Sequence, residues 1–501
     1  MGPLEWFAFA VGIWVVFHVG LALYNIFLHP LRNYPGPILD AATQLPYSYH
    51  MIKGDNTKYI AKLHERYGDV VRVGPNELSY ISASANRTIF GGKPTEENIY
   101  EKNPVIWLLG STAPITNLFF ARFHENIRYR KIIAPAFSEA AIREQEPIIQ
   151  KYVDGLIKGL KNRSGQAEFP DSNGVVNIAA WYNFVVFDIL TRLSFGEAQG
   201  CLENGQYDLW LEGLYDGLVQ SHFVQAAHRL RPYHSILERF IPSRVTKAHN
   251  SQTMDYYPRE LKKQQDKKES SIAGKPRTEF AAFFLDGLTH EELEDNVNVL
   301  VAAGADSTIT TMSSLTYYLT HNPESYRKLK NEIQGAFRAE HEITLTAVKH
   351  LEYLGAVIRE TLRIHPPVPM GLHRVAPSKG AVIDGQSVPG GTWVSVANLA
   401  ASRSPKYWRD PEHFIPERWL KENSDFDGDK REVHTPFSIG VRNCIGMSFS
   451  NAVLRLVTAR LLWNFDLQAQ PDNIDPHDHL EYAIWEAKPL RIKVSAANVK
   501  N

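Results

Sequence analysis

The stretch Phe437-Ser438-Ile439-Gly440-Val441-Arg442-Asn443-Cys444-Ile445-Gly446 contains Cys444, one of only two cysteines in this chain of 501 residues. A helical run follows it, so backbone N–H groups at a helix N-terminus should face the sulfur. Together with Arg442 they are expected to lower the pKa of the thiol. Gly440 and Gly446 remove side chains where a flat group must approach the backbone. One thiolate suits axial ligation of a haem iron, whereas structural zinc needs about four ligands.

The pattern F-x-x-G-x-R-x-C-x-G resembles the haem-binding loop of cytochromes P450, and all five fixed positions match: Phe437, Gly440, Arg442, Cys444 and Gly446. The alternative for an isolated cysteine is a buried, inert thiol in a turn. The resemblance implies haem b (iron protoporphyrin IX) with Cys444 as the iron ligand. It also implies the cytochrome P450 fold, mainly α with small β-sheets (α+β).

The composition is that of an ordinary globular protein, with 44% hydrophobic and 22% charged residues. A net charge of −1 gives no reason to expect nucleic acid as a partner. Two cysteines far apart in sequence do not form a disulfide framework, which favours a reducing compartment.

The N-terminus carries a long apolar run from Trp6 to Leu28. About 20 apolar residues span a bilayer, so residues 1–29 are predicted to be a transmembrane anchor. Basic residues follow the run, beginning with Arg32, which places the C-terminal side in the cytosol. A proline-rich hinge is expected over 30–45 and the catalytic domain over 46–501. The anchor and hinge resemble those of microsomal fungal family members, which implies a single-pass protein of the endoplasmic reticulum.

The body reads as mostly helical, with strands in two regions. Alternating residues over 69–74 and 77–81, split by Gly-Pro-Asn, predict a hairpin. A second β region is expected over 374–396. The polar, lysine-rich stretch 262–277 reads as a solvated connector. A Thr-x-x-Glu capping box at 289–292 precedes a long helix.

That helix contains Ala302-Ala303-Gly304-Ala305-Asp306-Ser307-Thr308-Ile309, an unfavourable combination for helix stability that suggests a functional site. Gly304 is expected to open room above a flat cofactor. Asp306 can feed protons through water, and the hydroxyl of Ser307 or Thr308 can hydrogen-bond bound oxygen or water. The segment resembles the oxygen-activating helix of the family, except that Ser307 stands where threonine is usual.

Glu360 and Arg363 lie three residues apart, on one helix face. They resemble the family's E-x-x-R element, and Arg418 lies in a segment that resembles its P-E-R-F/W element. The resemblance implies that these three residues form a charge network that braces the thiolate loop from its proximal side.

Arginines suit the haem carboxylates because the guanidinium fork matches a carboxylate. Arg442 is the first candidate for binding a haem carboxylate. Arg374 is the second, because its position matches a propionate-binding arginine of the family. Arg130 ranks third, in a segment that resembles the family's W/H-x-x-x-R helix. Asn126 stands there where tryptophan or histidine is usual.

The expected substrate is a lipophilic small molecule held in an apolar pocket. The fungal-type features resemble enzymes that tailor terpenoid or polyketide secondary metabolites, while sterol or fatty-acid oxidation stays open. Residues that resemble substrate-lining segments are Ile106, Trp107, Leu108, Val299, Ala303, Val368, Met370 and Ile484.

The chain carries no flavin or nicotinamide domain, so electrons from NADPH must arrive through a separate partner. The resemblance implies NADPH-cytochrome P450 reductase, with cytochrome b5 as an additional donor, acting on a monomer. The docking face is expected near Arg128, Arg130 and Lys131, where basic charge would guide an acidic reductase.

Two other functions stay open at this point. One is a haem-thiolate isomerase, dehydratase or desaturase without net hydroxylation. The serine at 307 keeps this alternative open. The other is a non-catalytic membrane protein that binds haem. The monooxygenase reading is favoured by Asp306 and by the membrane anchor.

Overall fold

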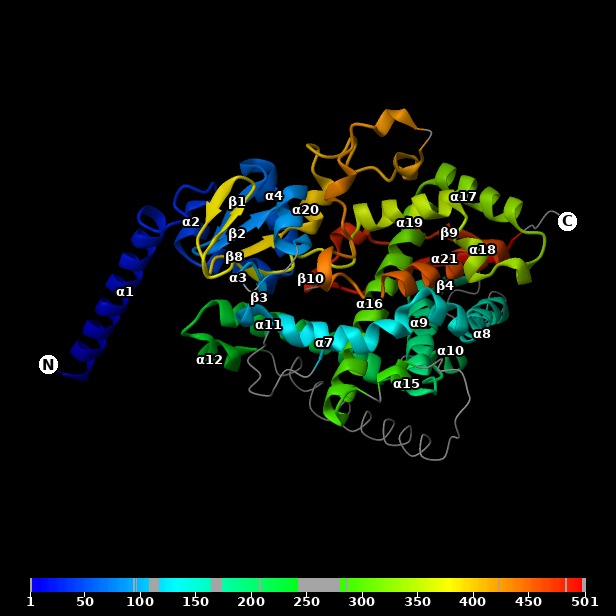
Figure 1. Cartoon of the computed structure of the whole chain (residues 1–501), viewed down its shortest axis with the longest axis horizontal. Helices are drawn as coiled ribbons and strands as arrows, with labels where there is room; N and C mark the ends of the chain where they lie inside the picture. Colours follow the sequence, from blue (N-terminus) through cyan, green and yellow to red (C-terminus); the bar gives the residue numbers. More distant parts are fainter. Residues whose placement is uncertain are drawn as a thin grey trace. The chain divides into compact units, whose positions relative to one another are not determined.

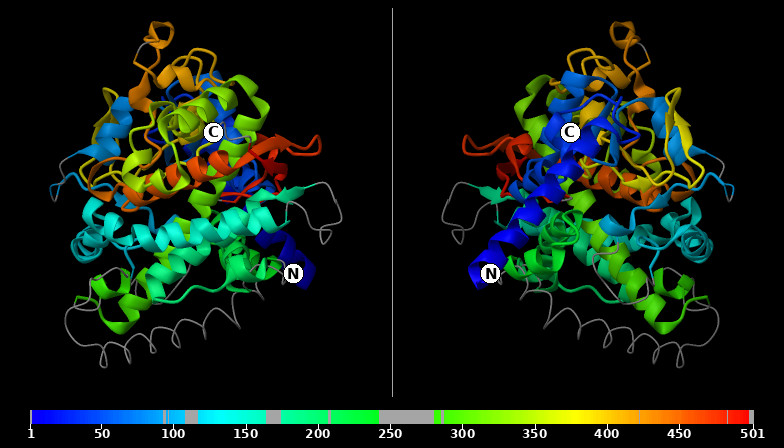
Figure 2. Two further views of the ribbon diagram at one scale, coloured as in Figure 1. Left: turned by 90° about the vertical axis from the view of Figure 1, so that its right-hand side faces the viewer. Right: turned by 90° about the vertical axis from the view of Figure 1, so that its left-hand side faces the viewer.

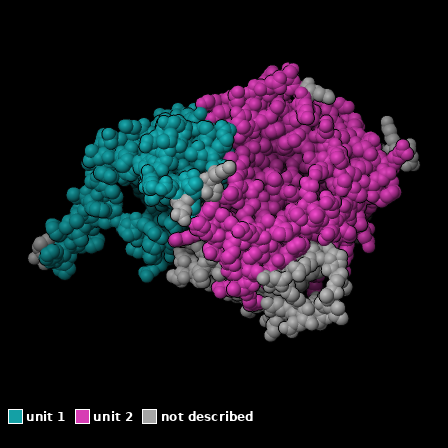
Figure 3. Space-filling model, viewed as in Figure 1, with its two compact units in different colours: residues 1–112, 221–241, 370–401 teal, residues 113–220, 242–369, 402–501 magenta. Residues whose placement is uncertain are grey.

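The computed structural model describes residues 2–92, 95, 97–107, 117–163, 174–206, 209–241, 280–284, 287–421, 423–482 and 484–497. The connector expected over 262–277 lies outside these residues. The chain divides into two compact units, coloured separately in Figure 3. Unit 1 comprises residues 1–112, 221–241 and 370–401, and unit 2 comprises residues 113–220, 242–369 and 402–501.

The apolar N-terminal run forms one continuous helix, α1 (Pro3–Phe27), which begins at the label N in Figure 2. A stretch of 18 among its 25 residues has a mean hydropathy of 2.0, and the large apolar side chains of the helix are exposed. A helix of this length measures about 38 Å, enough to cross a hydrocarbon core of about 30 Å. The predicted helix is therefore confirmed, and its composition is compatible with a membrane span.

Unit 1 is built on a five-stranded sheet in the order β1-β2-β8-β5-β3. The hairpin expected over 69–81 is confirmed as an antiparallel pair, β1 (Val70–Gly74) and β2 (Glu77–Tyr80). The second β region supplies the parallel partner β8 (Trp393–Val396) and the antiparallel strand β5 (Arg374–Val375). The remaining strands of the unit are the edge strand β3 (Glu101–Lys102) and the separate hairpin β6 (Ala381–Ile383) and β7 (Gln386–Val388).

A buried ion pair fastens the end of a long helix to this sheet. Arg229, the last residue of α11 (Leu209–Arg229), donates to Glu77 on β2 at 2.6 Å. Both side chains are fully buried, and His373 also contacts Glu77 at 3.1 Å. Burial alone would raise the pKa of Glu77, but Arg229 and His373 hold that pKa at about 2. The pair thus joins the end of α11 to the strand β2. Sequence patterns did not predict this link.

Unit 2 is centred on two packed helices, α16 (His290–His321) and α9 (Ile178–Phe195). The predicted capping box begins α16: Glu292 N donates to Thr289 Oγ1 at 3.2 Å, and Thr289 N donates to Glu292 Oε2 at 3.0 Å. The helix α9 is also long and apolar enough to span a membrane, but 94% of it is buried, which makes it a core helix.

Further helices and two small sheets enclose this core (Figure 1). The sheets have the orders β4-β12-β9 and β10-β11. The described architecture is therefore mostly helical with small sheets, as predicted. The main elements that surround the core are α7 (Phe123–Ile133), α8 (Glu139–Arg163), α17 (Pro323–Ala336), α19 (Glu352–Ile364), α21 (Met447–Asn464), β4 (Val175–Asn177), β9 (Phe465–Ala469), β10 (Glu481–Tyr482), β11 (Ile484–Trp485) and β12 (Arg491–Ala496).

Candidate haem-thiolate site

The cysteine loop is a tight turn that leads directly into α21. Cys444 N donates to Phe437 O at 2.8 Å and closes the turn. Gly440 has φ 77°, a left-handed conformation that glycine adopts without strain. Gly446 forms the N-cap of α21, and Ser450 N donates to its carbonyl at 2.8 Å. The sulfur therefore lies at a helix N-terminus, as expected.

The electrostatics of the thiol differ from the prediction. Burial raises the pKa of Cys444, while the Gly446 N–H and the Arg130 guanidinium act to lower it. The expected lowering is therefore wrong for the polypeptide alone, because desolvation of a thiolate outweighs one hydrogen bond and one cation. The cation that acts on the sulfur is Arg130 and not Arg442. A coordinated metal ion would supply the missing positive charge, since a metal-bound thiol loses its proton.

Two observations show that the loop fits a haem. Cys444 is exposed to solvent although enough protein surrounds it to raise its pKa, as expected for a thiol that faces an internal space. Gly446 has an ordinary φ of −85°, and a Cβ added there would meet no atom of the chain within 4 Å. The polypeptide itself does not require glycine at 446, whereas a flat group close to the backbone would.

Two arginines fasten this loop to the region around α7. Arg130 on α7 donates to Asn443 O at 2.7 Å and to Asn443 Oδ1 at 2.8 Å. In the opposite direction, Arg442 donates to Ala121 O at 2.8 Å. We call these three hydrogen bonds the arginine clasp. The sequence did not reveal the part played by Asn443, because one asparagine before a cysteine gives no signal without its partner.

The role of the arginines toward haem propionates stays a prediction. The clasp uses Nη1 and Nη2 of Arg130 and Nη2 of Arg442. Arg374 is buried on β5 of unit 1 and donates to His373 O at 3.0 Å. Asn126 is buried and donates to Leu118 O at 2.8 Å, so its side chain stabilises the turn before α7.

One face of α16 is accessible in an otherwise buried stretch. Ala303 is exposed and Ser307 is half-buried one turn later, whereas Val301 and Ala305 are buried. Ser307 Oγ donates to Ala303 O at 2.8 Å. The expectation that Gly304 makes room for a cofactor is wrong. A Cβ at 304 would lie 3.2 Å from Leu190 Cδ1, so this glycine allows α9 to pack closely.

The two neighbours of Ser307 face the protein interior. Asp306 is buried, and Thr308 is buried with its Oγ1 3.2 Å from Ser450 Oγ. Ser450 lies in the first turn of α21, which follows Cys444 directly. The Thr308–Ser450 contact therefore holds the middle of α16 beside the helix that carries the thiolate loop. Of the two candidate hydroxyls, only that of Ser307 lies on the accessible face.

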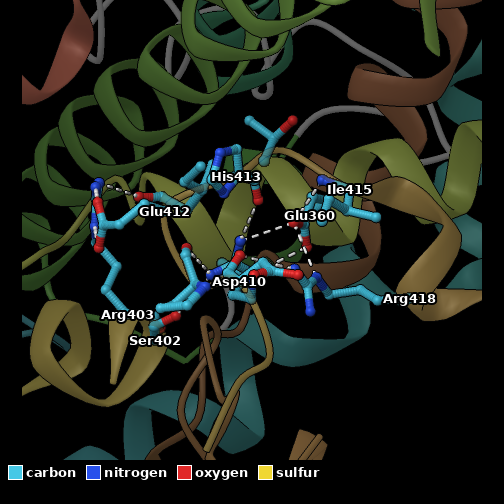
Figure 4. A network of polar contacts seen from close by, with 12 residues as sticks. Glu360, Ser402, Arg403, Asp410, Glu412, His413, Ile415 and Arg418 are labelled. Carbon is cyan, nitrogen blue, oxygen red and sulfur yellow. Dashed lines mark hydrogen bonds and ion pairs between the residues drawn. The ribbon is translucent and has the colours of Figure 1, made fainter. Parts of the chain in front are cut away.

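The predicted network of Glu360, Arg363 and Arg418 is present, and all three side chains are fully buried (Figure 4). Glu360 accepts from Arg363 at 2.7 and 2.9 Å, from Arg418 at 3.1 Å, and from Ile415 N at 2.9 Å. Burial alone would raise the pKa of Glu360, but these two guanidinium groups lower it.

The network extends toward the cysteine loop through Asp429, which the sequence did not indicate, and through Trp419, the last residue of the P-E-R-F/W element. Arg418 donates to Asp429 Oδ2 at 2.6 Å, and Trp419 Nε1 donates to Glu360 Oε2 at 2.9 Å. The Trp419 ring lies 5.0 Å from the ring of His434, three residues before Phe437. The network therefore fixes the chain that leads into the thiolate loop.

The predicted substrate-lining residues fall in both units. Val299 and Ala303 lie four residues apart on α16, and Ile484 lies on β11, which contacts α16. Val368 of unit 2 is half-buried. Ile106 and Met370 are buried in unit 1. Leu108 and the side chain of Trp107 lie outside the described part of the chain.

Comparison with known proteins agrees with the geometry. The family model for cytochrome P450 matches residues 34–494. Cytochrome P450 monooxygenase lnbC of Aspergillus flavus is 57% identical over 482 residues, covering 96% of this chain and 95% of the relative. Cytochrome P450 monooxygenase FrzC of Cladobotryum is 47% identical, covering 99% and 98%. Averantin hydroxylase of Dothistroma septosporum is 33% identical, covering 98% and 91%.

The buried network should be essential to stability. Glu360→Gln leaves two guanidinium groups without their carboxylate, so the free energy of unfolding should fall by about 3–5 kcal/mol in urea denaturation. Lys349→Ala, which removes an exposed ion pair with Glu139 at 3.0 Å, should cost at most about 1 kcal/mol. Because the folded-state pKa of Glu360 is lowered, its contribution is complete above the unfolded pKa and is lost as pH falls. A Gln variant as stable as the Lys349→Ala control would contradict the assignment.

The arginine clasp should hold the sulfur in its ligating position. Arg130→Ala removes both bonds to Asn443, and Asn443→Ala removes only the side-chain bond; each bond to a charged group contributes about 1.5–3 kcal/mol. Under mild urea, the fraction of the reduced carbon-monoxide complex that keeps the thiolate-type absorption band should fall most in Arg130→Ala and less in Asn443→Ala. Arg143→Ala, an exposed arginine on α8, is the control. Equal bands in all four proteins would show that the clasp does not position Cys444.

Proposed function

The chain belongs to the cytochrome P450 family and is a monooxygenase, and on this premise we propose that it hydroxylates a lipophilic small molecule. The net reaction places one atom of O₂ into a substrate C–H bond and reduces the other to water with two electrons from NADPH and two protons. The observation that carries the proposal is the accessible face of α16. Apolar Val299 and Ala303 are followed there by the hydroxyl of Ser307, beside the helix that carries the Cys444 loop.

The proposed substrate class is a secondary metabolite of terpenoid or polyketide type. One relative is named for hydroxylating averantin, and others are named as fungal cytochrome P450 monooxygenases. An apolar lining suits such substrates because burying their carbon skeleton against apolar side chains is energetically favourable. The half-buried Val299, Val368 and Ile484 are the candidates for this lining in unit 2.

The cofactor proposed for the Cys444 loop is haem b, which supplies oxygen activation when it is bound through the thiolate. Residues of the chain then control protons. The buried Asp306 is proposed to hold a proton, and Ser307, the next residue of α16, to pass it on through its hydroxyl. Ser307 lacks the methyl group that limits the rotamers of threonine, so its hydroxyl can exchange between Ala303 O and a partner outside the helix.

The α1 helix is proposed to anchor the protein in the endoplasmic reticulum membrane, with the catalytic body in the cytosol. Its length and hydropathy support a span, and basic residues follow it in sequence. The prolines of the hinge precede two short helices, α2 (Ile38–Ala42) and α3 (Leu45–Lys53). Arg72 N donates to Pro35 O at 2.7 Å, so this segment is bonded to the sheet strand β1.

Electrons are proposed to arrive from NADPH-cytochrome P450 reductase at the α7 side of the Cys444 loop. Exposed basic residues there include Arg122 and Lys131. Arg128, which the sequence suggested for docking, is paired with Glu292 and with Glu125. Its charge is therefore largely committed to fixing α7 against the start of α16.

The function is tested by turnover of the membrane-bound protein. Membranes containing the protein, the reductase and NADPH are incubated under ¹⁸O₂ with fungal metabolites, and the products are analysed by mass spectrometry. Hydroxylation predicts one labelled oxygen atom per product. Products of unchanged mass, or products lacking two hydrogens, would instead indicate isomerisation or desaturation.

Removal of the proton-delivery groups should uncouple NADPH consumption from product formation. Asp306→Asn and Ser307→Ala should each lower product formation about 10²-fold or more, within the range of general acid–base effects. The measurement is the ratio of product formed to NADPH consumed. Thr320→Ala is the matched control, since Thr320 Oγ1 bonds Thr316 O on the same helix as Ser307 bonds Ala303 O. A ratio in Ser307→Ala equal to that of the control would remove Ser307 from the mechanism.

Charge reversal should identify the docking face. Lys131→Glu should slow reduction of the iron several-fold at low ionic strength and less at high salt, because the attraction is screened. Stopped-flow reduction by the reductase measures this, with substrate affinity unchanged. Lys493→Glu, an exposed lysine on β12, is the control. If Lys131→Glu is reduced at the control rate at every salt concentration, the reductase docks elsewhere.

A further inference from the structure

The side chain of His365 joins separate segments of unit 2. It is buried and lies directly after α19, whose last residue is Ile364. Its Nε2 lies 3.2 Å from Pro476 O, in the short turn η9 (Pro476–Asp478), and its Nδ1 lies 2.8 Å from Ser314 Oγ on α16. A carbonyl oxygen can only accept, so Nε2 donates to it, and Nδ1 of the neutral ring accepts from the Ser314 hydroxyl.

Trp485 on β11 completes this arrangement. Its ring stacks on the His365 ring, with centroids 4.5 Å apart and an angle of 25° between the planes. Its Nε1 donates to Pro366 O at 2.8 Å. Pro366 is buried just beyond the end of α19, where its carbonyl would be costly to leave without a donor. We call the contacts of His365 with Ser314, Pro476 and Trp485, together with that of Trp485 with Pro366, the histidine junction.

The junction determines which side chain of β11 is accessible. Consecutive side chains of a strand point to opposite faces. Trp485 is buried, so the neighbouring Ile484 points the other way, and there it is half-buried. β10 pairs with β11 through Glu481 with Trp485 and Tyr482 with Ile484. A slip of one residue would exchange the two faces, and the contacts of Trp485 with His365 and Pro366 oppose such a slip.

The junction also holds the segment that follows His365. Pro366, Pro367 and Pro369 are buried, whereas Val368 between them is half-buried. The proline rings restrict the backbone of this segment, and the bond from Trp485 fixes where it begins. Val368 is therefore presented by a stiff stretch of chain whose position follows that of Trp485.

The third element at the junction is the accessible face of α16. Ser314 follows Ser307 by seven residues, which is about two turns, so both lie on the same side of the helix. The junction thus contacts the continuation of the stripe that carries Ala303 and Ser307, about 10 Å further along α16.

We propose that His365 and Trp485 set the positions of Val368 and Ile484 relative to α16, and so determine which apolar molecules the pocket accepts. The proposal rests on the proposed function, in which a lipophilic substrate lies beside α16. His365 and Trp485 are positioning residues, since both are buried and act through the two half-buried side chains. The ligands that sense the junction are those with an apolar chain long enough to reach Val368 and Ile484.

The test is spectral titration of the full-length haem-loaded protein with two probes, 1-methylimidazole and 1-octylimidazole. Each binds the iron through its ring nitrogen, but only the octyl chain reaches the apolar lining. His365→Phe keeps a ring for stacking and removes both hydrogen bonds. Trp485→Phe tests the junction independently from β11, because it removes the bond to Pro366 O. In both variants 1-octylimidazole should bind about tenfold more weakly, since each methylene that loses apolar contact weakens binding about fourfold. The affinity for 1-methylimidazole should change less than twofold.

Tyr182→Phe is the matched control. The Tyr182 hydroxyl lies 2.6 Å from Thr316 Oγ1 on α16, and both residues are buried. Thr316 is two residues, or about 200°, from Ser314, so this variant removes a buried bond to the same helix on its other side. The control should leave both affinities unchanged. If it weakens 1-octylimidazole as much as His365→Phe does, loosening of α16 explains the effect and the proposal is overturned. Equal weakening of both probes in the junction variants would place the effect at the iron and would also overturn it.

A double-mutant cycle tests whether His365 acts through the two lining residues. In a protein carrying Val368→Ala and Ile484→Ala, adding His365→Phe should change the 1-octylimidazole affinity less than twofold. A full tenfold effect in that background, or no effect of His365→Phe in the unsubstituted protein, would overturn the proposal. These outcomes are independent of turnover: absence of ¹⁸O in the product would overturn the proposed hydroxylation and leave the binding results standing.

Discussion

A carboxylate without solvent contact, Glu360, is the constraint on which the catalytic half of the molecule depends. Removing its charge from water costs several kcal/mol, and only complete pairing offsets that cost. The structure provides that pairing through Arg363, Arg418, Trp419 and one backbone N–H group. These donors come from two distant stretches of sequence. All of them can pair with Glu360 only when α19 packs in one orientation against the chain that precedes the thiolate loop.

The thiolate loop is thus held from two directions. The Glu360 network fixes the chain that enters the loop, through Asp429 and the Trp419–His434 contact. The arginine clasp holds the residue immediately before Cys444. This matters because the polypeptide disfavours the thiolate, as the raised pKa of Cys444 shows. The protein contributes fixed geometry, and a metal ion would contribute the charge that keeps the sulfur ionised.

Sequence patterns predicted the features that depend on neighbouring residues. The hairpin at 69–81, the capping box at 289–292 and the pairing of Glu360 with Arg363 are local, and each was confirmed. A contact between distant segments was predicted where the family resemblance supplied it, as for Arg418 with Glu360. The contacts of Arg229 with Glu77 and of Arg130 with Asn443 were not predicted. Gly304 shows the limit clearly. Its small size suggested space for a cofactor, but only the position of Leu190 on α9 reveals which side of α16 it faces.

On the oxygen-binding side of the site, the chemistry depends on which side-chain hydroxyl of α16 is accessible. In α16 the accessible hydroxyl belongs to Ser307, whereas Thr308 is turned toward Ser450 and acts in packing α16 against α21. Threonine at 307 would add a methyl group on the face that Ala303 leaves open, and would restrict the hydroxyl to fewer rotamers. Serine keeps a hydroxyl for the proposed proton path while leaving more room. If Ser307 delivers protons as proposed, this position ties proton delivery to the size of the substrate that can approach α16.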